Sequence, residues 1–297
     1  MHAEDTAQCF ASHMGLWAIQ PRWMQTALQA LQLGAWKSLA SPSEAASSRD
    51  RPFALSPDGT ALVRLEGQIT KYPSKFGGTS AVLTRRILGQ AIADPDVRSI
   101  MLAIDSPGGQ VAGINDLAET VRRATQTKPV TAFIEDLGAS AAYWVASQAQ
   151  TIVATPTTEI GSIGVFAVLQ DISGAAEREG ITIRVVSTGP FKGLGVPGTP
   201  VTQEMIDDVQ AHVDQIGLFF FRAVQQGRRM SAKQLEAVTD GRVWLAEEAM
   251  QRGLIDRIGG FDDALIVAGS TKPRRRQAAE QRHAQLHAMR EQLDGRS

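Results

Sequence analysis

The chain has 297 residues, of which 43% are hydrophobic and 21% charged, and its formal net charge is −1. This composition is typical of a globular protein, and the near-neutral charge gives no reason to expect nucleic-acid binding. Cys9 is the only cysteine, which excludes an intrachain disulfide and a cysteine-based metal centre. No apolar run approaches the roughly 20 residues that span a bilayer, and the start of the chain lacks a signal peptide pattern. We therefore expect a cytoplasmic protein without a membrane span.

Residues 1–55 predict a helical arm followed by a linker. Pro21 suits the first turn of a helix, and residues 41–56 are rich in Ser, Ala and Pro. Apolar residues recur behind Pro21 at helical spacing, namely Met24, Leu28, Leu31 and Ala35. Two interpretations stay open for this arm: packing on its own domain, or binding a partner.

Residues 56–268 predict one α/β domain. The apolar pattern indicates strands over 61–67, 99–104, 130–134, 151–154, 165–168 and 181–186, and helices over 79–93, 111–124, 139–149, 170–179 and 202–228. Strands that alternate with helices favour a largely parallel sheet. Residues 269–297 are polar, and we expect a mobile tail or a partner helix there. His283 and His287 are spaced like metal ligands on a helix, but a solvated face is the better interpretation because no third ligand accompanies them.

Two motifs follow predicted strands directly and carry candidate chemistry. Asp105-Ser106-Pro107-Gly108-Gly109 offers glycine N–H groups that a ligand can approach closely. Gly138-Ala139-Ser140-Ala141-Ala142 places a serine among small residues at the start of a helix. The plain alternatives are a strand-to-helix turn for the first motif and a helix-capping role for Ser140.

A histidine base for Ser140 is hard to find in this chain. Four of the five histidines lie in the terminal segments, and His212 falls inside a long helical pattern. A lysine can replace histidine where desolvation leaves its amine neutral. Lys192 stands in a loop rich in Gly and Pro, and Ser162 stands in a glycine-bracketed turn, Gly161-Ser162-Ile163-Gly164. By itself such a lysine is usually solvated, and such a serine usually serves the turn.

The order of these four motifs resembles the signal peptide peptidase A (SppA) family of Ser–Lys peptidases over about residues 60–265. The segment 105–109 looks like the oxyanion turn of that family, and 138–143 looks like its nucleophile segment. The stretch 161–165 is similar to its Gly-Ser-Ile-Gly-Val sequence. Residues 187–192 resemble its Ser-Gly-x-x-Lys segment, with one extra residue between Ser187 and Gly189.

This resemblance implies a Clp-protease/crotonase-like α/β fold with repeated strand-strand-helix units, flanked here by the helical arm and the tail. It also implies a set of roles. Ser140 would be the nucleophile and Lys192 the general base, with Ser162 orienting the lysine amine. Backbone N–H groups of Gly108 or Gly109 and of Ala141 would form the oxyanion hole, and no metal or cofactor is needed.

The segment Gly15-Leu16-Trp17-Ala18-Ile19-Gln20-Pro21 resembles the N-terminus of phage-encoded members, which process capsid components. We therefore expect a phage or prophage head-maturation protease that acts on capsid, scaffold or portal proteins, in the host cytoplasm or inside proheads. Alternatives are a cytoplasmic signal-peptide-peptidase-like protease, an idle structural head protein, and a crotonase-type acyl-CoA enzyme. A homo-oligomer is expected because the family forms rings. Aromatic residues that look exposed favour it too, namely Trp17, Trp23, Trp36, Phe219, Phe220 and Phe221.

Overall fold

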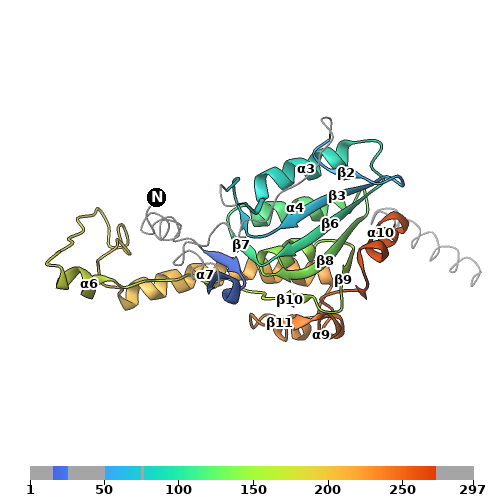
Figure 1. Ribbon diagram of the computed structural model, residues 1–297. Helices are drawn as coiled ribbons and strands as arrows, with labels where there is room; N and C mark the ends of the chain where they lie inside the picture. Colours follow the sequence, from blue (N-terminus) through green and yellow to red (C-terminus); the bar gives the residue numbers. More distant parts are fainter. Residues whose placement is uncertain (1–15, 26–50, 75–76, 272–297) are drawn as a thin grey trace, which may run out of the picture.

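A computed structural model describes residues 16–25, 51–74 and 77–271 of the protein. Its centre is an eight-stranded sheet in the order β11-β10-β8-β6-β3-β2, with β9 beside β8 and β12 beside β9. The inner strands β3 (Thr60–Glu66), β6 (Ser99–Ser106) and β8 (Val130–Ala139) pair in parallel. The predicted α/β class with a largely parallel sheet is confirmed (Figure 1).

Strand β8 pairs with different strands along its length, and its C-terminal part ends at the candidate site. Residues 131–134 of β8 pair with β9 (Thr151–Ala154), whereas residues 137–139 pair with β10 (Glu159–Gly161). The second half of β8 therefore lies against the Gly161 turn. The sheet is completed by β2 (Ala54–Leu55), β11 (Val243–Leu245) and β12 (Arg257–Ile258).

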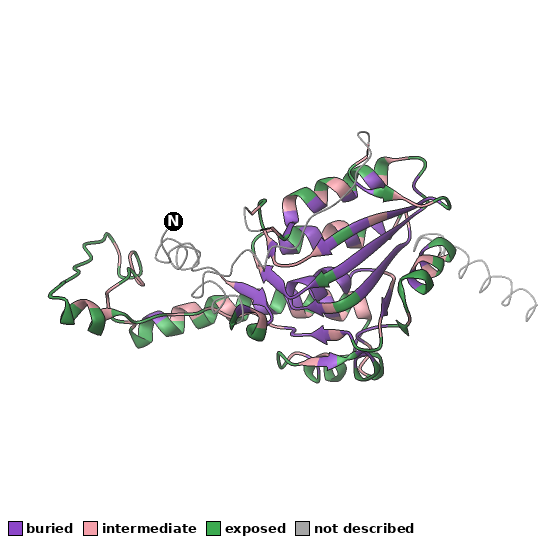
Figure 2. Ribbon diagram, viewed as in Figure 1, coloured by how far each residue is buried: buried purple, intermediate pink, exposed green. Residues whose placement is uncertain are grey.

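Helices cover both faces of this sheet because its strands are apolar on both sides. Ile100 and Leu102 face a core shared with α3 (Ala81–Ala93), α4 (Ile114–Ala124), α5 (Ala141–Ala146) and α7 (Gln203–Arg228). Met101 faces the opposite side and packs with α10 (Phe261–Ser270). Figure 2 shows the resulting buried strands. The remaining helices of the body are α8 (Ala232–Glu236) and α9 (Ala246–Gln251).

A second, four-stranded sheet has the order β1-β7-β4-β5. Strand β7 (Gly108–Gln110) continues from β6, and it lies between β1 (Trp17–Ile19) and β4 (Ile69–Thr70). Strand β5 (Thr79–Ser80) closes the far edge. This small sheet joins the N-terminal segment to the glycines of the predicted oxyanion turn.

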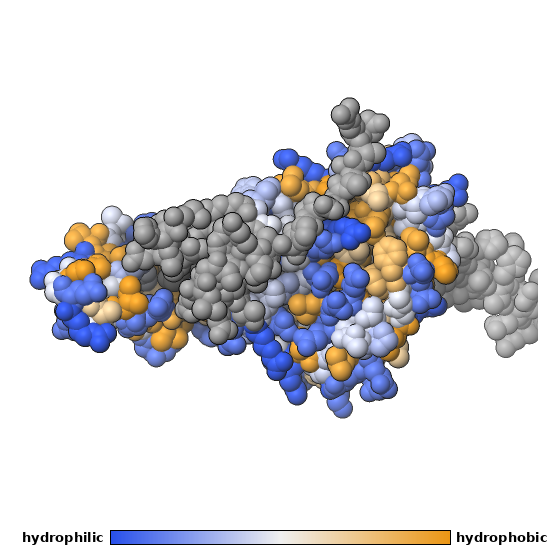
Figure 3. Space-filling view, in the orientation of Figure 1, coloured by the Kyte–Doolittle hydropathy of each residue, from blue (hydrophilic) through white to orange (hydrophobic). Residues whose placement is uncertain are grey.

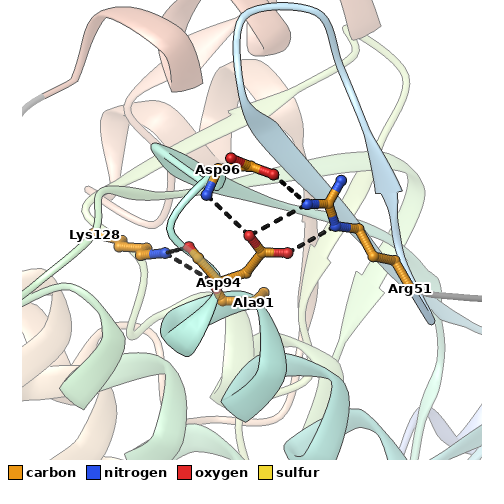
Figure 4. Close-up of polar contacts among 5 residues, drawn as sticks. All are labelled: Arg51, Ala91, Asp94, Asp96 and Lys128. Carbon is orange, nitrogen blue, oxygen red and sulfur yellow. Dashed lines mark hydrogen bonds and ion pairs between the residues drawn. The ribbon is translucent and has the colours of Figure 1, made fainter.

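A cluster of polar side chains holds the segment before β2, at residue 51, against the rest of the fold (Figure 4). Arg51 donates to the carboxylates of Asp94 and Asp96, and the Arg51 Nε–Asp94 Oδ2 distance is 2.7 Å. The ammonium group of Lys128 donates to the carbonyl oxygens of Ala91, at 2.9 Å, and Asp94. These bonds satisfy the C-terminal carbonyl groups of α3 and hold the helix end to the loop before β8.

A projection built from α6 (Ser173–Arg178) and the outer part of α7 extends from this body; it is called the arm below and is distinct from the N-terminal segment 1–55. One prediction fails in it. The long helix α7 extends away from the sheet, and α6 lies at its far end (Figure 1). The strand predicted over 181–186 is wrong: those residues form no strand, and Val186 is 98% exposed. An alternating sequence makes a strand only where another strand pairs with it, and none does so in this part of the described chain. The strand predicted over 165–168 is reduced to a single bridge at Phe166.

Apolar side chains are exposed along the arm (Figure 3). Of the aromatic residues expected to meet a partner, the three phenylalanines lie on α7 and Trp17 lies in β1. Phe219 is exposed and Phe220 is fully buried, so the three phenylalanines do not share one environment. Trp17 corrects the expectation, because it is only 6% exposed and packs beside Phe166. Before α7, the exposed apolar residues of the arm include Val168, Ile172, Ile181, Ile183, Val185, Val186, Phe191 and Val196.

The predicted helices of the body all occur, within a few residues of their expected ends. The rest of the N-terminal helix beyond residue 25, Trp36, and the tail with His283 and His287 lie outside the described residues. Within the described ranges, no helix is both long enough and apolar enough to cross a membrane.

Candidate active site

Ser140 occupies a strained turn between β8 and α5. Its φ is 53° and its ψ −121°, a conformation that costs a non-glycine residue about 1–3 kcal/mol. The turn is held by main-chain bonds: the N–H of Ser140 donates to Gly161 O at 2.8 Å, and Trp144 N–H donates to Ser140 O at 2.8 Å. A sharp, strained strand-to-helix turn is the arrangement that presents a nucleophilic serine in α/β-hydrolases.

The hydroxyl group of Ser140 does not cap its helix. No side-chain capping bond forms at α5, and Oγ instead points toward the carbonyl oxygen of Gly164, 3.5 Å away. That distance is at the outer limit of a hydrogen bond, so the hydroxyl is held only weakly. The helix-capping alternative for Ser140 therefore has no support in the structure.

Gly108 and Ala141 come together at this turn. A Cβ placed on Gly108 would lie 2.8 Å from the amide nitrogen of Ala141 and 2.9 Å from Ala139 O. Gly108 also has a φ of 93°, which side chains rarely tolerate. Only glycine lets the two main-chain segments approach this closely, so both predicted N–H donors flank the serine turn.

The N–H groups of Gly108 and Gly109 point in different directions. Gln20 N–H donates to Pro107 O and Val111 N–H donates to Leu16 O, which places Ala18 and Gly109 in the hydrogen-bonded phase of the β1–β7 ladder. The N–H of Gly109 is therefore directed at β1. The N–H of Gly108 has a weaker partner, the hydroxyl of Ser106 at 3.2 Å. Gly108 is the better placed of the two as an oxyanion donor.

Ser106 is a residue that the sequence did not single out. It is fully buried, and its hydroxyl donates to Gly67 O at 2.6 Å while accepting from Gly108 N–H. This pair of bonds fixes the direction of the Gly108 peptide. The only signal in the sequence is the position of Ser106 inside the glycine motif.

Ser162 lies in the turn that touches Ser140. Its φ is 50°, it is 5% exposed, and its N–H donates to Arg242 O at 2.7 Å. Among the described residues nothing hydrogen-bonds its hydroxyl, so that group is available to a further side chain. Ser140, Ser162, Gly108 and Ala141 thus gather within one small region.

The structure does not bring Lys192 to this region. Lys192 is exposed, in a turn where its N–H donates to Gly189 O at 3.0 Å. The segment around it lies with α6 at the outer end of the arm, far from β8 and its Gly161 turn in Figure 1. His212 does not replace it, because its ring is exposed on α7 and faces Asp208.

Two further features border the serine. A pocket of about 500 Å³ opens beside the Gly161 turn, between Ile163, Gly164 and Val165 on one side and Gly217 and Phe221 of α7 on the other. At the carboxyl end of β6, Asp105 lies near Glu135 and Asp136, and partial desolvation together with these charges raises the pKa of the Asp105 carboxyl. In the part of the chain that the structure describes, no group of three potential metal ligands occurs.

A mixed α/β sheet with a serine at a strained turn and glycine N–H groups beside it defines a Clp-protease-like fold with a candidate nucleophile. The model of peptidase family S49 matches residues 122–272, about half of the chain, and the chain belongs to this family.

The relatives include cellular and phage proteins. The chain is 30% identical to Protease 4 of Haemophilus influenzae over 230 residues, which are 76% of this chain and 37% of that protein. It is 31% identical to the capsid assembly protease C of Escherichia phage lambda over 215 residues, 72% of this chain and 48% of that protein. It is 33% identical to the head-tail preconnector protein GP5 of Enterobacteria phage P21 over 180 residues, which are 61% of this chain and 36% of that protein. The chain thus spans about half of these relatives or less.

Proposed function

We propose that this protein is a serine endopeptidase in which Ser140 is the nucleophile and Lys192 the general base, and that it cleaves capsid, scaffold or portal proteins during phage head maturation. The observation that carries the proposal is the convergence of the strained Ser140 turn with the backbones of Gly108 and Ala141. The substrate class rests on the similarity to phage relatives whose names refer to capsid assembly and to head-tail connection.

The reaction is acyl transfer to the serine. The neutral amine of Lys192 accepts the proton of Ser140 Oγ as this oxygen attacks a peptide carbonyl carbon, and the N–H groups of Gly108 and Ala141 stabilise the oxyanion, each by about 3 kcal/mol. Lys192 then gives the proton to the leaving amine, and water hydrolyses the acyl-enzyme. Ser162 orients the lysine amine through its hydroxyl group, which no described residue hydrogen-bonds.

The position of Lys192 adds one requirement: the dyad is completed by the arm of a second copy. The arm carries Lys192 away from the serine of its own chain, and it exposes apolar residues that a neighbouring subunit would cover. A closed homo-oligomer in which each arm reaches the next body satisfies both observations.

A fluorophosphonate probe tests the nucleophile. Labelling of the wild-type protein at Ser140, with none in Ser140→Ala, is the expected result, because only an activated serine reacts. Absence of labelling in the assembled protein would favour a structural head protein with an idle site. Co-expression with neighbouring capsid genes, followed by mass spectrometry of the cut termini, tests the substrate class. Capsid proteins left intact there, in a protein that does label, would favour a cellular protease instead.

A further inference from the structure

Resting on the proposed function, we infer that the N-terminal segment Trp17–Gln20 occupies the position of an extended peptide substrate and inhibits the enzyme until it leaves. Its site is the slot between β7, which carries Gly108, and the segment at Phe166, which follows the Gly161 turn. The inference comes from the pairing of this segment on both of its edges.

The main chain of the segment is bonded alternately to two sides. On one side it pairs antiparallel with β7, in the register Trp17–Gln110, Ala18–Gly109 and Ile19–Gly108. On the other side Trp17 N–H donates to Phe166 O and Phe166 N–H donates to Trp17 O, both at 2.9 Å. Extended peptides are commonly bound through this addition of a strand to exposed edges.

The slot adjoins the reacting groups. The point where a Cβ on Gly108 would lie is 2.3 Å from Ala18 O and 2.8 Å from Ala141 N, so a carbonyl of the segment sits next to the proposed oxyanion donors. The Phe166 side begins two residues after Gly164, whose carbonyl oxygen faces Ser140 Oγ. A substrate strand could not bind here while the segment remains.

The anchoring of the segment is local. Trp17, Ile19 and Met24 form a small cluster of their own with Trp23 and Phe166, separate from the main core. Outside this cluster, Gln20 Nε2 donates to Glu159 Oε2 at 2.9 Å. Leaving the slot therefore breaks the satellite cluster, the β7 ladder, the bridge to Phe166 and the Gln20–Glu159 bond, while the two clusters on the faces of the large sheet stay packed apart from Ala18.

The segment is shaped as an inhibitor and not as a substrate. Its extended part ends at Gln20, and residues 21–25 are helical. A substrate would need extended chain on the leaving side of the scissile bond as well. Pro21 also has no N–H with which to continue the ladder.

A reversible disulfide tests the inference in the full chain. Trp17 and Gln110 form a non-hydrogen-bonded pair, with Cα atoms about 4.5 Å apart, which suits a disulfide. In a Cys9→Ser background, Trp17→Cys with Gln110→Cys locks the segment when oxidised. We expect the oxidised, locked protein to hydrolyse casein at least about tenfold more slowly, because its slot is closed in nearly all molecules. Dithiothreitol should restore the rate. The single-cysteine variants, treated identically, are the controls.

Two further readouts separate inhibition from a structural role. Trp17→Ala is expected to raise the rate of casein hydrolysis, since the segment loses its main anchor, whereas a purely structural strand would give a loss. With Ser140→Ala added to the double-cysteine variant, a fluorescent casein peptide should bind the reduced form and not the oxidised form. Equal hydrolysis or equal binding in both redox states overturns the inference alone. Absence of peptide binding in both states overturns the proposed peptidase as well.

Discussion

The amide of Ser140 and the carbonyl oxygen of Gly161 are joined by a 2.8 Å hydrogen bond, and both residues have positive φ angles, of 53° and 127°. The bond connects the turn after β8 with the turn after β10. Each strained turn therefore holds the other, and the serine and Ser162 keep a fixed relation. Strain of this kind persists only where the surrounding structure over-determines it, and it concentrates at functional sites.

Ser140→Ala and Ser140→Gly are both expected to abolish casein hydrolysis and fluorophosphonate labelling, because both remove the hydroxyl. Their stabilities should differ: glycine tolerates a φ of 53°, so the glycine variant is expected to exceed the alanine variant by about 1 kcal/mol in free energy of unfolding. Urea denaturation measures the difference. Hydrolysis at the wild-type rate in either variant would remove Ser140 from the mechanism.

Gly108→Ala is expected to lower kcat by about 10²–10³-fold, since a Cβ there would meet both Ala18 O and Ala141 N and displace an oxyanion donor. Gly253→Ala is the matched control. Gly253 has a φ of 77°, but a Cβ on it meets only Met230 at 3.6 Å, so it carries backbone strain without the close approach. A control variant as inactive as Gly108→Ala would mean that strain alone explains the loss.

The sequence was informative where local rules decide the structure. The apolar pattern predicted the buried strand Ser99–Ser106, and turn chemistry predicted the glycine turn that comes after it. Both occur as expected. The helices of the arm were predicted, but the segment between them was not, because residues 181–186 have strand propensity and no strand to pair with. The burial of Trp17 was missed for a related reason: it depends on pairing with β7, about 90 residues later, which no local pattern encodes.

Lys192→Ala and Ser140→Ala are each expected to be inactive, and mixing the two should restore activity if the dyad forms between subunits. In a randomly mixed ring, a site works only when a copy with intact Ser140 meets a neighbour with intact Lys192, so about one quarter of the wild-type rate is expected. The mixture is made by co-expression with two affinity tags and assayed after tandem purification. A dyad within one chain predicts no recovery. Lys192→Arg should also stay inactive, because arginine does not release its proton.

Asp105→Asn is expected to stabilise the protein at neutral pH. Partial desolvation and the neighbouring carboxylates raise the pKa of Asp105 in the folded state, so its ionisation begins to oppose folding above the unfolded-state pKa and does so fully above the folded-state pKa. Asparagine removes that cost and still offers an oxygen to the N–H of Leu137. The gain in free energy of unfolding should shrink as the pH falls through the folded-state pKa, because the aspartate is then protonated and neutral, like the asparagine. Urea midpoints of both proteins between pH 3.5 and 7 check this, and a gain that does not depend on pH would contradict it.

Arg228 and Asp256 connect the end of α7 to β9, and breaking this pair is expected to cost more than breaking an exposed one. Arg228 donates to both oxygens of Asp256, at 2.7 and 2.9 Å, and Asp256 Oδ2 also accepts Ile152 N–H at 2.7 Å. The side chain of Arg228 is only 6% exposed, so Asp256→Ala leaves a buried charge without its partner. We expect a loss of about 2–3 kcal/mol, below the full value for buried pairs because Asp256 is itself partly solvated.

Asp116→Ala is the matched control, since it breaks the exposed ion pair with Arg85 and should cost less than about 1 kcal/mol. Urea denaturation of the two variants compares the losses directly. Tyr143 of the nucleophile helix donates its hydroxyl to Leu254 O, two residues before Asp256, so the same segment supports α5. Asp256→Ala should therefore also slow labelling at Ser140, which Asp116→Ala should not. Equal losses of stability in the two variants would show that the pair does not fasten α7 to the site.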